Sequence, residues 1–74
     1  MKKKALFSGT FDPFTIGHYS LITRALCFTE EIVIAIGINY EKKTFYSLEE
    51  RIRTIQKIYI EEQRIKIMSY DMLT

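Results

Sequence analysis

Residues 32–38 constrain the fold of this chain more than any other segment. They read Ile-Val-Ile-Ala-Ile-Gly-Ile, a continuous apolar run that is rich in β-branched side chains and too short for a typical helix. A strand of this composition is buried on both faces, which is the environment of strands in parallel sheets covered by helices. The run therefore predicts an α/β protein with a parallel sheet.

Two elements are expected before this strand. Residues 5–7 form a short apolar run after a basic start, and predict a buried strand that begins near Lys4. Residues 17–28 then change to helical spacing, with apolar side chains mostly three or four residues apart. Thr15 stands before this helix as its expected N-cap.

Two further elements are expected after it. Ser47 and Glu50 have the spacing of a capping box, in which the serine hydroxyl accepts from the Glu50 backbone and the carboxylate reaches back. The helix that this box opens has one apolar stripe, made of Leu48, Ile52, Ile55 and Tyr59. Residues 65–68 alternate at first, as expected of an edge strand.

The resulting order is β-α-β-α-β, and 74 residues have room for one small domain. Short connections and right-handed crossovers give the strand order 3-2-1, the mononucleotide-binding half of a doubly wound, Rossmann-like parallel sheet. Ligands bind to such sheets beyond the carboxyl ends of the strands, so we expect a site where loops 8–17, 39–47 and 69–74 meet. Because strand one would be central in a full sheet, we expect this chain to be a fragment or to need another chain.

Composition narrows the class of protein. No apolar run approaches the ~18 residues of a membrane span, and the basic start is not followed by the apolar region of a signal peptide. We therefore expect a cytoplasmic protein with no membrane partner. A net charge of +2 is too small to indicate a nucleic-acid partner. Cys27, the single cysteine, cannot form an internal disulfide, and its apolar helical context predicts a buried side chain.

The loop at residues 8–18 carries the chemical signal. It has neither the three-glycine dinucleotide fingerprint nor the lysine of a P-loop. Gly9 and Gly17 permit close approach of the backbone to a ligand. His18 lies in the first helical turn, where free amides and the helix dipole favour an anion, and its ring can donate to a phosphate. Thr10 offers a hydroxyl at the carboxyl end of the strand.

Each of these residues also has an ordinary structural interpretation. A histidine at a helix start is usually exposed or capping, and a threonine at a strand end often caps a turn. Asp12-Pro13 is a turn signal, and Phe11 and Phe14 taken alone would be core residues.

The combination is more specific than its parts. Residues 9–13, Gly-Thr-Phe-Asp-Pro, followed by Thr15-x-Gly17-His18, resemble the signature of the nucleotidyltransferase superfamily with a T/H-x-G-H motif after its first strand. Lys42-Lys43 and the segments 45–51 and 70–74 make the whole chain similar to the bacterial phosphopantetheine adenylyltransferase family. Two residues depart from that family's pattern, Ser8 from a usual proline and Ile16 from a usual asparagine.

The resemblance implies that AMP is transferred from ATP to 4′-phosphopantetheine, which gives dephospho-coenzyme A and pyrophosphate in coenzyme A biosynthesis. It implies Mg²⁺ carried with ATP, a homo-oligomer that is hexameric in the family, and a chain that is the N-terminal half of one nucleotidyltransferase domain. The implied catalytic residues are His18 and Lys42. The implied ATP-binding residues are Gly9, Thr10, Phe11, Gly17 and His18, and those for phosphopantetheine are Thr10, Lys42 and Thr74. No residue is assigned as a metal ligand.

Two alternatives stay open. One is a sibling enzyme of the same superfamily, a cytidylyltransferase or a nicotinamide-nucleotide adenylyltransferase, in which the acceptor differs. The other is a non-catalytic nucleotide-binding module, in which ATP binds without turnover. Lys42 taken alone would be an ordinary solvated loop residue.

Overall fold

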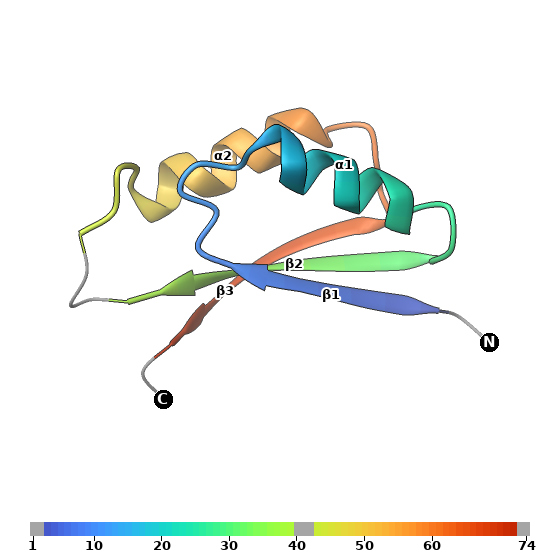
Figure 1. Ribbon diagram of the computed structural model, residues 1–74, viewed down its shortest axis with the longest axis horizontal. Coiled ribbons are helices and arrows are strands. Elements are labelled where there is room, and N and C mark those ends of the chain that lie inside the picture. The colour runs from blue at the N-terminus through green and yellow to red at the C-terminus, as the bar shows by residue number, and fades with distance from the viewer. Residues whose placement is uncertain (1–2, 40–42, 73–74) are drawn as a thin grey trace.

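The described part of this protein is a three-stranded parallel sheet with two helices on one face (Figure 1). The computed structural model describes residues 3–39 and 43–72. The elements follow in the order β1 (Lys4–Gly9), α1 (Ile16–Ala25), β2 (Glu31–Ile38), α2 (Leu48–Ile58) and β3 (Ile65–Asp71). The strands lie in the order β1-β2-β3 with both pairings parallel, so the expected α/β class and the order 3-2-1 are confirmed.

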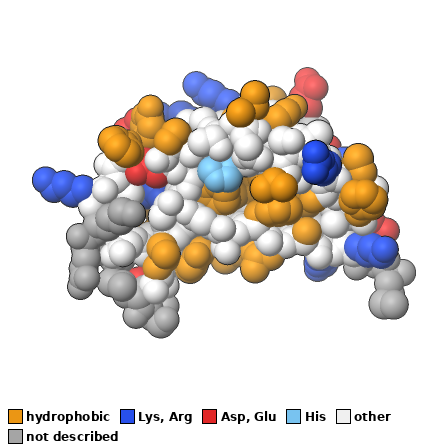
Figure 2. Space-filling model, viewed as in Figure 1, with side chains coloured by type: hydrophobic (Ala, Val, Ile, Leu, Met, Phe, Trp, Pro, Cys, Tyr) orange, Lys and Arg blue, Asp and Glu red, His pale blue; other side chains and the backbone are white. Residues whose placement is uncertain are grey.

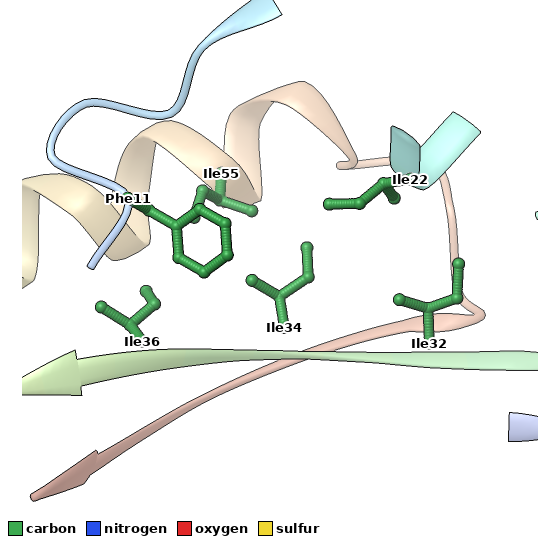
Figure 3. Packing of buried hydrophobic residues seen from close by; sticks show 6 residues of the cluster. All are labelled: Phe11, Ile22, Ile32, Ile34, Ile36 and Ile55. Carbon is green, nitrogen blue, oxygen red and sulfur yellow. The ribbon is translucent and has the colours of Figure 1, made fainter. Parts of the chain in front are cut away.

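The core lies between β2 and the two helices. Ile32, Ile34 and Ile36 alternate along β2, point toward the helices and are fully buried (Figure 3). They pack with Ile22 of α1 and Ile55 of α2, and with the ring of Phe11 from the loop after β1. Burying each such side chain contributes roughly 1.5–3 kcal/mol, so this layer holds the helices onto the sheet.

The opposite face of the sheet is not covered by a helix among the described residues. Leu6 and Met68 lie on this face and are 68% and 49% exposed. Leu6 pairs with Val33 of β2, and Met68 pairs with Ala35, so both lie beside β2 residues that point away from the helices. The expected burial of the first strand is therefore wrong for Leu6, because both crossovers pass over the other side of the sheet (Figure 1). On β2, Ala35 and Gly37 alternate with the core isoleucines and are buried, so the expected burial of that strand on both faces is confirmed there.

Helix α1 begins as expected and ends early. Thr15 is its N-cap, which confirms that prediction, but the helix ends at Ala25 instead of near residue 28. The backbone N–H groups of Cys27 and Phe28 bond to carbonyls three residues back, in a turn that directs both side chains outward. Cys27 is exposed and Phe28 is 72% exposed, so the expected burial of the cysteine is wrong.

Helix α2 has the expected apolar stripe and a different cap. The Ser47 hydroxyl accepts from the Glu50 backbone N–H at 3.1 Å, as predicted, but it donates to the Glu50 carboxylate at 3.2 Å. The carboxylate therefore meets the serine hydroxyl and not the serine backbone. Strand β3 continues to Asp71, so residues 69–71 belong to the strand and not to the expected third loop.

No helix within residues 3–39 and 43–72 has the length and apolar character needed to cross a membrane.

Candidate functional site

The loop from β1 to α1 and the segment before α2 meet at the carboxyl ends of the strands (Figure 1). The Asp12 carboxylate accepts from the backbone N–H groups of Phe45 and Tyr46, at 2.6 and 2.8 Å. The Arg51 guanidinium donates to the carbonyl of Thr10 at 2.8 Å. Two of the three loops expected at this edge are thus in direct contact.

The His18 ring is held by the N-cap of its own helix. The backbone N–H of Thr15 donates to His18 Nδ1 at 2.9 Å, and the Thr15 Oγ1 lies 3.1 Å from the same nitrogen. In return, the His18 backbone N–H donates to Thr15 Oγ1 at 3.4 Å, so the ring takes the place that a glutamate usually has in a capping box. Because Nδ1 accepts from a backbone amide, the neutral ring carries its proton on Nε2. The cap thus leaves Nε2–H as the donor of the ring, and its expected contact with a phosphate stays a prediction.

Aromatic side chains fix the plane of this ring. The Phe11 ring contacts the His18 ring edge to face at a centroid distance of 4.9 Å, and the Phe14 ring lies 5.4 Å from it. His18 is half-buried, and Figure 2 shows the histidine (pale blue) at the molecular surface among hydrophobic side chains. A cavity of about 140 Å³ lies beside it, lined in part by Ser8 and Leu21. The ring is thus oriented by packing while one edge stays accessible.

The two helix N-termini differ in charge. The first turn of α1 contains no acidic residue, whereas that of α2 contains Glu49 and Glu50. The amides of Ile16 and Gly17 have no acceptor within their helix, since the first amides of any helix lack one. The first turn of α1 thus has no acidic side chain of its own to occupy the positive end of its dipole, and an anion that binds there gains from both effects.

The remaining residues of the first loop have separate roles. The Phe11 ring is 5% exposed and belongs to the core, and its backbone has a φ of 50°, a conformation that usually favours glycine. A Cβ atom at Gly9 would lie 3.6 Å from that ring, and one at Gly17 would lie 3.6 Å from the Thr15 hydroxyl. Both are ordinary contacts, so packing within the chain does not require either glycine. Their expected role, close approach of a ligand, stays a prediction.

Two of the expected site residues, Lys42 and Thr74, lie outside the described residues. Sequence reasoning also overlooked two residues that join the loops, Asp12 and Arg51. The sequence placed Asp12 in a turn and in the motif of residues 9–13, but gave it no role in joining the loops. Arg51 had a detectable signal, because it lies three residues after Leu48 and four before Ile55, on the buried side of α2.

Other parts of the described chain offer less chemistry. No group of three His, Cys, Asp or Glu side chains within residues 3–39 and 43–72 is arranged to hold a metal ion. A groove of about 580 Å³ lies between α2 and β3 and includes Tyr59 and Ile65. It is at the amino end of β3, away from the loops that meet at the carboxyl ends. The first loop is therefore the better candidate site.

Comparison with known proteins agrees with the family resemblance seen in the sequence. Residues 6–74 match the sequence profile of a family described as cytidylyltransferase-like. Curated relatives named phosphopantetheine adenylyltransferase occur in Bacteroides fragilis, with 56% identity over 72 residues, and in Bacteroides thetaiotaomicron, with 57% identity over 72 residues. Each alignment covers 97% of this chain and 48% of the relative, so the chain spans about half the length of the curated relatives that it matches.

Solved structures share the fold. The crystal structure of NadR protein in complex with NAD and AMP-PNP superposes with a TM-score of 0.83 at 20% sequence identity, over 96% of this chain and 21% of that chain. A second NadR structure, in complex with NR, also gives a TM-score of 0.83 and covers 95% of this chain and 20% of that chain. At this identity the likeness concerns the Rossmann-like architecture alone.

Proposed function

Because this chain belongs to the cytidylyltransferase-like family, we propose that it carries the phosphate-binding half of an enzyme that transfers AMP from ATP to 4′-phosphopantetheine. The name shared by the curated relatives supports this acceptor. Their length supports a single nucleotidyltransferase domain of which these residues are the N-terminal half. The products would be dephospho-coenzyme A and pyrophosphate.

The observation that carries the proposal is the environment of His18. Its Nδ1 is occupied by the Thr15 amide, so Nε2–H is the ring's donor. The ring lies in the first turn of a helix, and that turn contains no acidic residue. A phosphate bound there meets a ring donor and backbone amides together. We assign the α-phosphate of ATP to this position. Gly9, Gly17 and the backbone of Phe11 would contact the bound ATP beside it.

The reaction needs little from the protein beyond placement and positive charge. A phosphate oxygen of the acceptor attacks the α-phosphorus of ATP, and the bond from that phosphorus to the bridging oxygen breaks as pyrophosphate leaves. The nucleophile is already an anion, so no general base is required. What is required is that two anions meet in line while charge in the transition state is stabilised. Mg²⁺ arrives on the triphosphate as part of the ATP substrate.

The acceptor side follows from the family resemblance. Thr10 would hold the phosphate of phosphopantetheine with its hydroxyl and also contact ATP. Lys42 would bind the same phosphate and stabilise the transition state, and Thr74 would contact the pantetheine arm. The position of Thr10 beside α2 supports this assignment, since the Thr10 carbonyl accepts a hydrogen bond from Arg51 of that helix. A homo-oligomer, hexameric as in the family, and a cytoplasmic location complete the proposal.

Pyrophosphate release is the direct test. The full-length protein should release pyrophosphate when it is given MgATP and phosphopantetheine together. It should release none when it is given either substrate alone. Replacing ATP by CTP, or phosphopantetheine by nicotinamide mononucleotide, tests the sibling enzymes that stay open as alternatives. Turnover with one of those pairs would reassign the substrates, and ATP binding without any turnover would favour a non-catalytic module.

A further inference from the structure

We propose that Asp12 and Arg51 act together as positioning residues that fix Thr10 at the site. We call this pair the loop clamp. The two side chains act on the same loop from opposite directions: Asp12 extends from the loop to the segment before α2, and Arg51 extends from α2 back to the loop. Neither has been assigned a contact with substrate, and their effect on the reaction rests on the function proposed above.

Arg51 is a buried cation that bonds to backbone carbonyls. It is 5% exposed and is the only buried charged side chain in the described part of the chain. Nη1 donates to the carbonyls of Thr10 at 2.8 Å and Gly37 at 3.4 Å, and Nε donates to that of Ser47 at 3.4 Å. These carbonyls belong to the residue that follows β1, to the last part of β2 and to the N-cap of α2. One guanidinium thus joins three segments at the carboxyl edge of the sheet.

Burial of this cation is costly, and no ion pair among the described residues offsets the cost. Two ion pairs occur within residues 3–39 and 43–72, and neither of them involves Arg51. A buried charge without a counter-ion destabilises a fold unless its hydrogen bonds compensate. An apolar side chain at this helix position would pack against the core without that cost. The arginine therefore has a use that packing does not supply, and the carbonyl of Thr10 is its shortest contact.

Asp12 completes the connection from the other side of Phe11. Its two carboxylate oxygens each accept one backbone N–H, from Phe45 and Tyr46. Hydrogen bonds to an ionised acceptor are about twice as strong as neutral ones. Thr10 and Asp12 are the neighbours of Phe11, whose φ of 50° is an unfavourable conformation for a side chain of this size. The clamp thus holds the chain on both sides of Phe11, the one non-glycine residue with a positive φ in the described part of the chain.

The clamp links catalysis to the second loop. Thr10 must hold two phosphates in an in-line geometry, and a misplacement of about 1 Å in such a site can reduce turnover a hundredfold. Loss of either member frees one end of the loop, so Thr10 would sample other positions. Because both members serve one geometry, loss of the second should add little to loss of the first.

The test uses the full-length protein with four single variants and one double variant. Arg51→Lys keeps the charge but loses the forked geometry, and Asp12→Asn keeps the shape but loses one acceptor oxygen. Arg53→Lys and Glu49→Gln are matched controls, since both residues are exposed on α2. At a temperature well below each melting midpoint, we expect Arg51→Lys and Asp12→Asn to lower kcat by about ten- to a hundredfold. The double variant should fall no further than the worse single one, and the controls should keep normal kcat.

Normal kcat in the folded Arg51→Lys and Asp12→Asn proteins would overturn the proposal, and so would additive losses in the double variant. Backbone hydrogen exchange keeps the test separate from the proposed function. The amides of Phe45 and Tyr46 should be protected in the parent protein and in Glu49→Gln, and should exchange faster in Asp12→Asn. If the parent protein transfers no AMP, the proposed function fails, while loss of this protection would still support the clamp. Unchanged protection in Asp12→Asn would reject it.

Discussion

Replacing His18 by three different side chains separates its two contacts. The ring accepts from the Thr15 amide through Nδ1 and, in the proposed reaction, donates to the α-phosphate through Nε2. His18→Ala removes both contacts. His18→Asn keeps an acceptor oxygen near the position of Nδ1 and removes the distant donor. His18→Gln places an amide N–H near the position of Nε2 and removes the nearby acceptor.

The size of each effect follows from the contact that is lost. Loss of one transition-state donor lowers kcat by about two to three orders of magnitude, or about 2.7–4 kcal/mol. Loss of a capping interaction costs about 1 kcal/mol of stability. We therefore expect His18→Ala to lose both turnover and stability, and His18→Asn to lose turnover alone. His18→Gln should lose stability and retain part of the turnover.

Two measurements on the full-length variants check this pattern. Pyrophosphate release at saturating MgATP and phosphopantetheine gives kcat, and denaturant unfolding gives stability. KM should change little, because the donor acts mainly in the transition state. Near-normal kcat in His18→Asn would refute the reasoning, since that variant has no donor at the Nε2 position. A loss that resides wholly in KM would refute it equally.

Three further predictions concern other parts of the chain. Lys42→Ala should weaken phosphopantetheine binding on the order of tenfold in calorimetry, whereas Lys43→Ala should change that affinity little. If Lys42→Ala lost ATP binding alone, the assignment would be contradicted. Burial and the nearby Tyr19 raise the pKa of Tyr59 to about 12, so stability should fall as pH rises from the unfolded value of about 10. Tyr59→Phe should flatten that fall in pH-dependent unfolding, and an unchanged pH profile would reject the cause. The 74-residue chain alone should self-associate or unfold and should transfer no AMP. Leu6→Thr should reduce the association in sedimentation velocity, because Leu6 is exposed on the uncovered face of the sheet. A monodisperse, active monomer would contradict this.

The fold could be predicted because each element has a local signal of its own. The β-branched run in β2, the Thr15 cap and the Leu48–Ile55 spacing each depend on neighbours in sequence, and all three are confirmed. Errors arose where a local pattern continued past the end of its element. Phe28 fits the apolar period of α1, but the helix ends three residues before it.

The candidate site was predictable in part. The place of His18 in the first turn follows from its position three residues after the cap, a local rule. The contact between Asp12 and the amides of Phe45 and Tyr46 joins residues more than thirty positions apart, and no periodicity reports such a pair. Arg51 was overlooked for a related reason, since its partners are backbone carbonyls, which leave no trace in the residue types of a sequence.

The order β1-β2-β3 has a consequence for how the sheet is made. Each strand pairs with a strand that is adjacent to it along the chain, so a nascent chain can add strands one at a time as it leaves the ribosome. Every closure spans a single helix, and contacts of short sequence separation form fastest. In the proposed longer enzyme, the strands of this half can therefore begin to pair before the second half is synthesised. During that interval the uncovered face around Leu6 and Met68 stays in water, which makes the pace of translation a factor in whether the protein folds or aggregates.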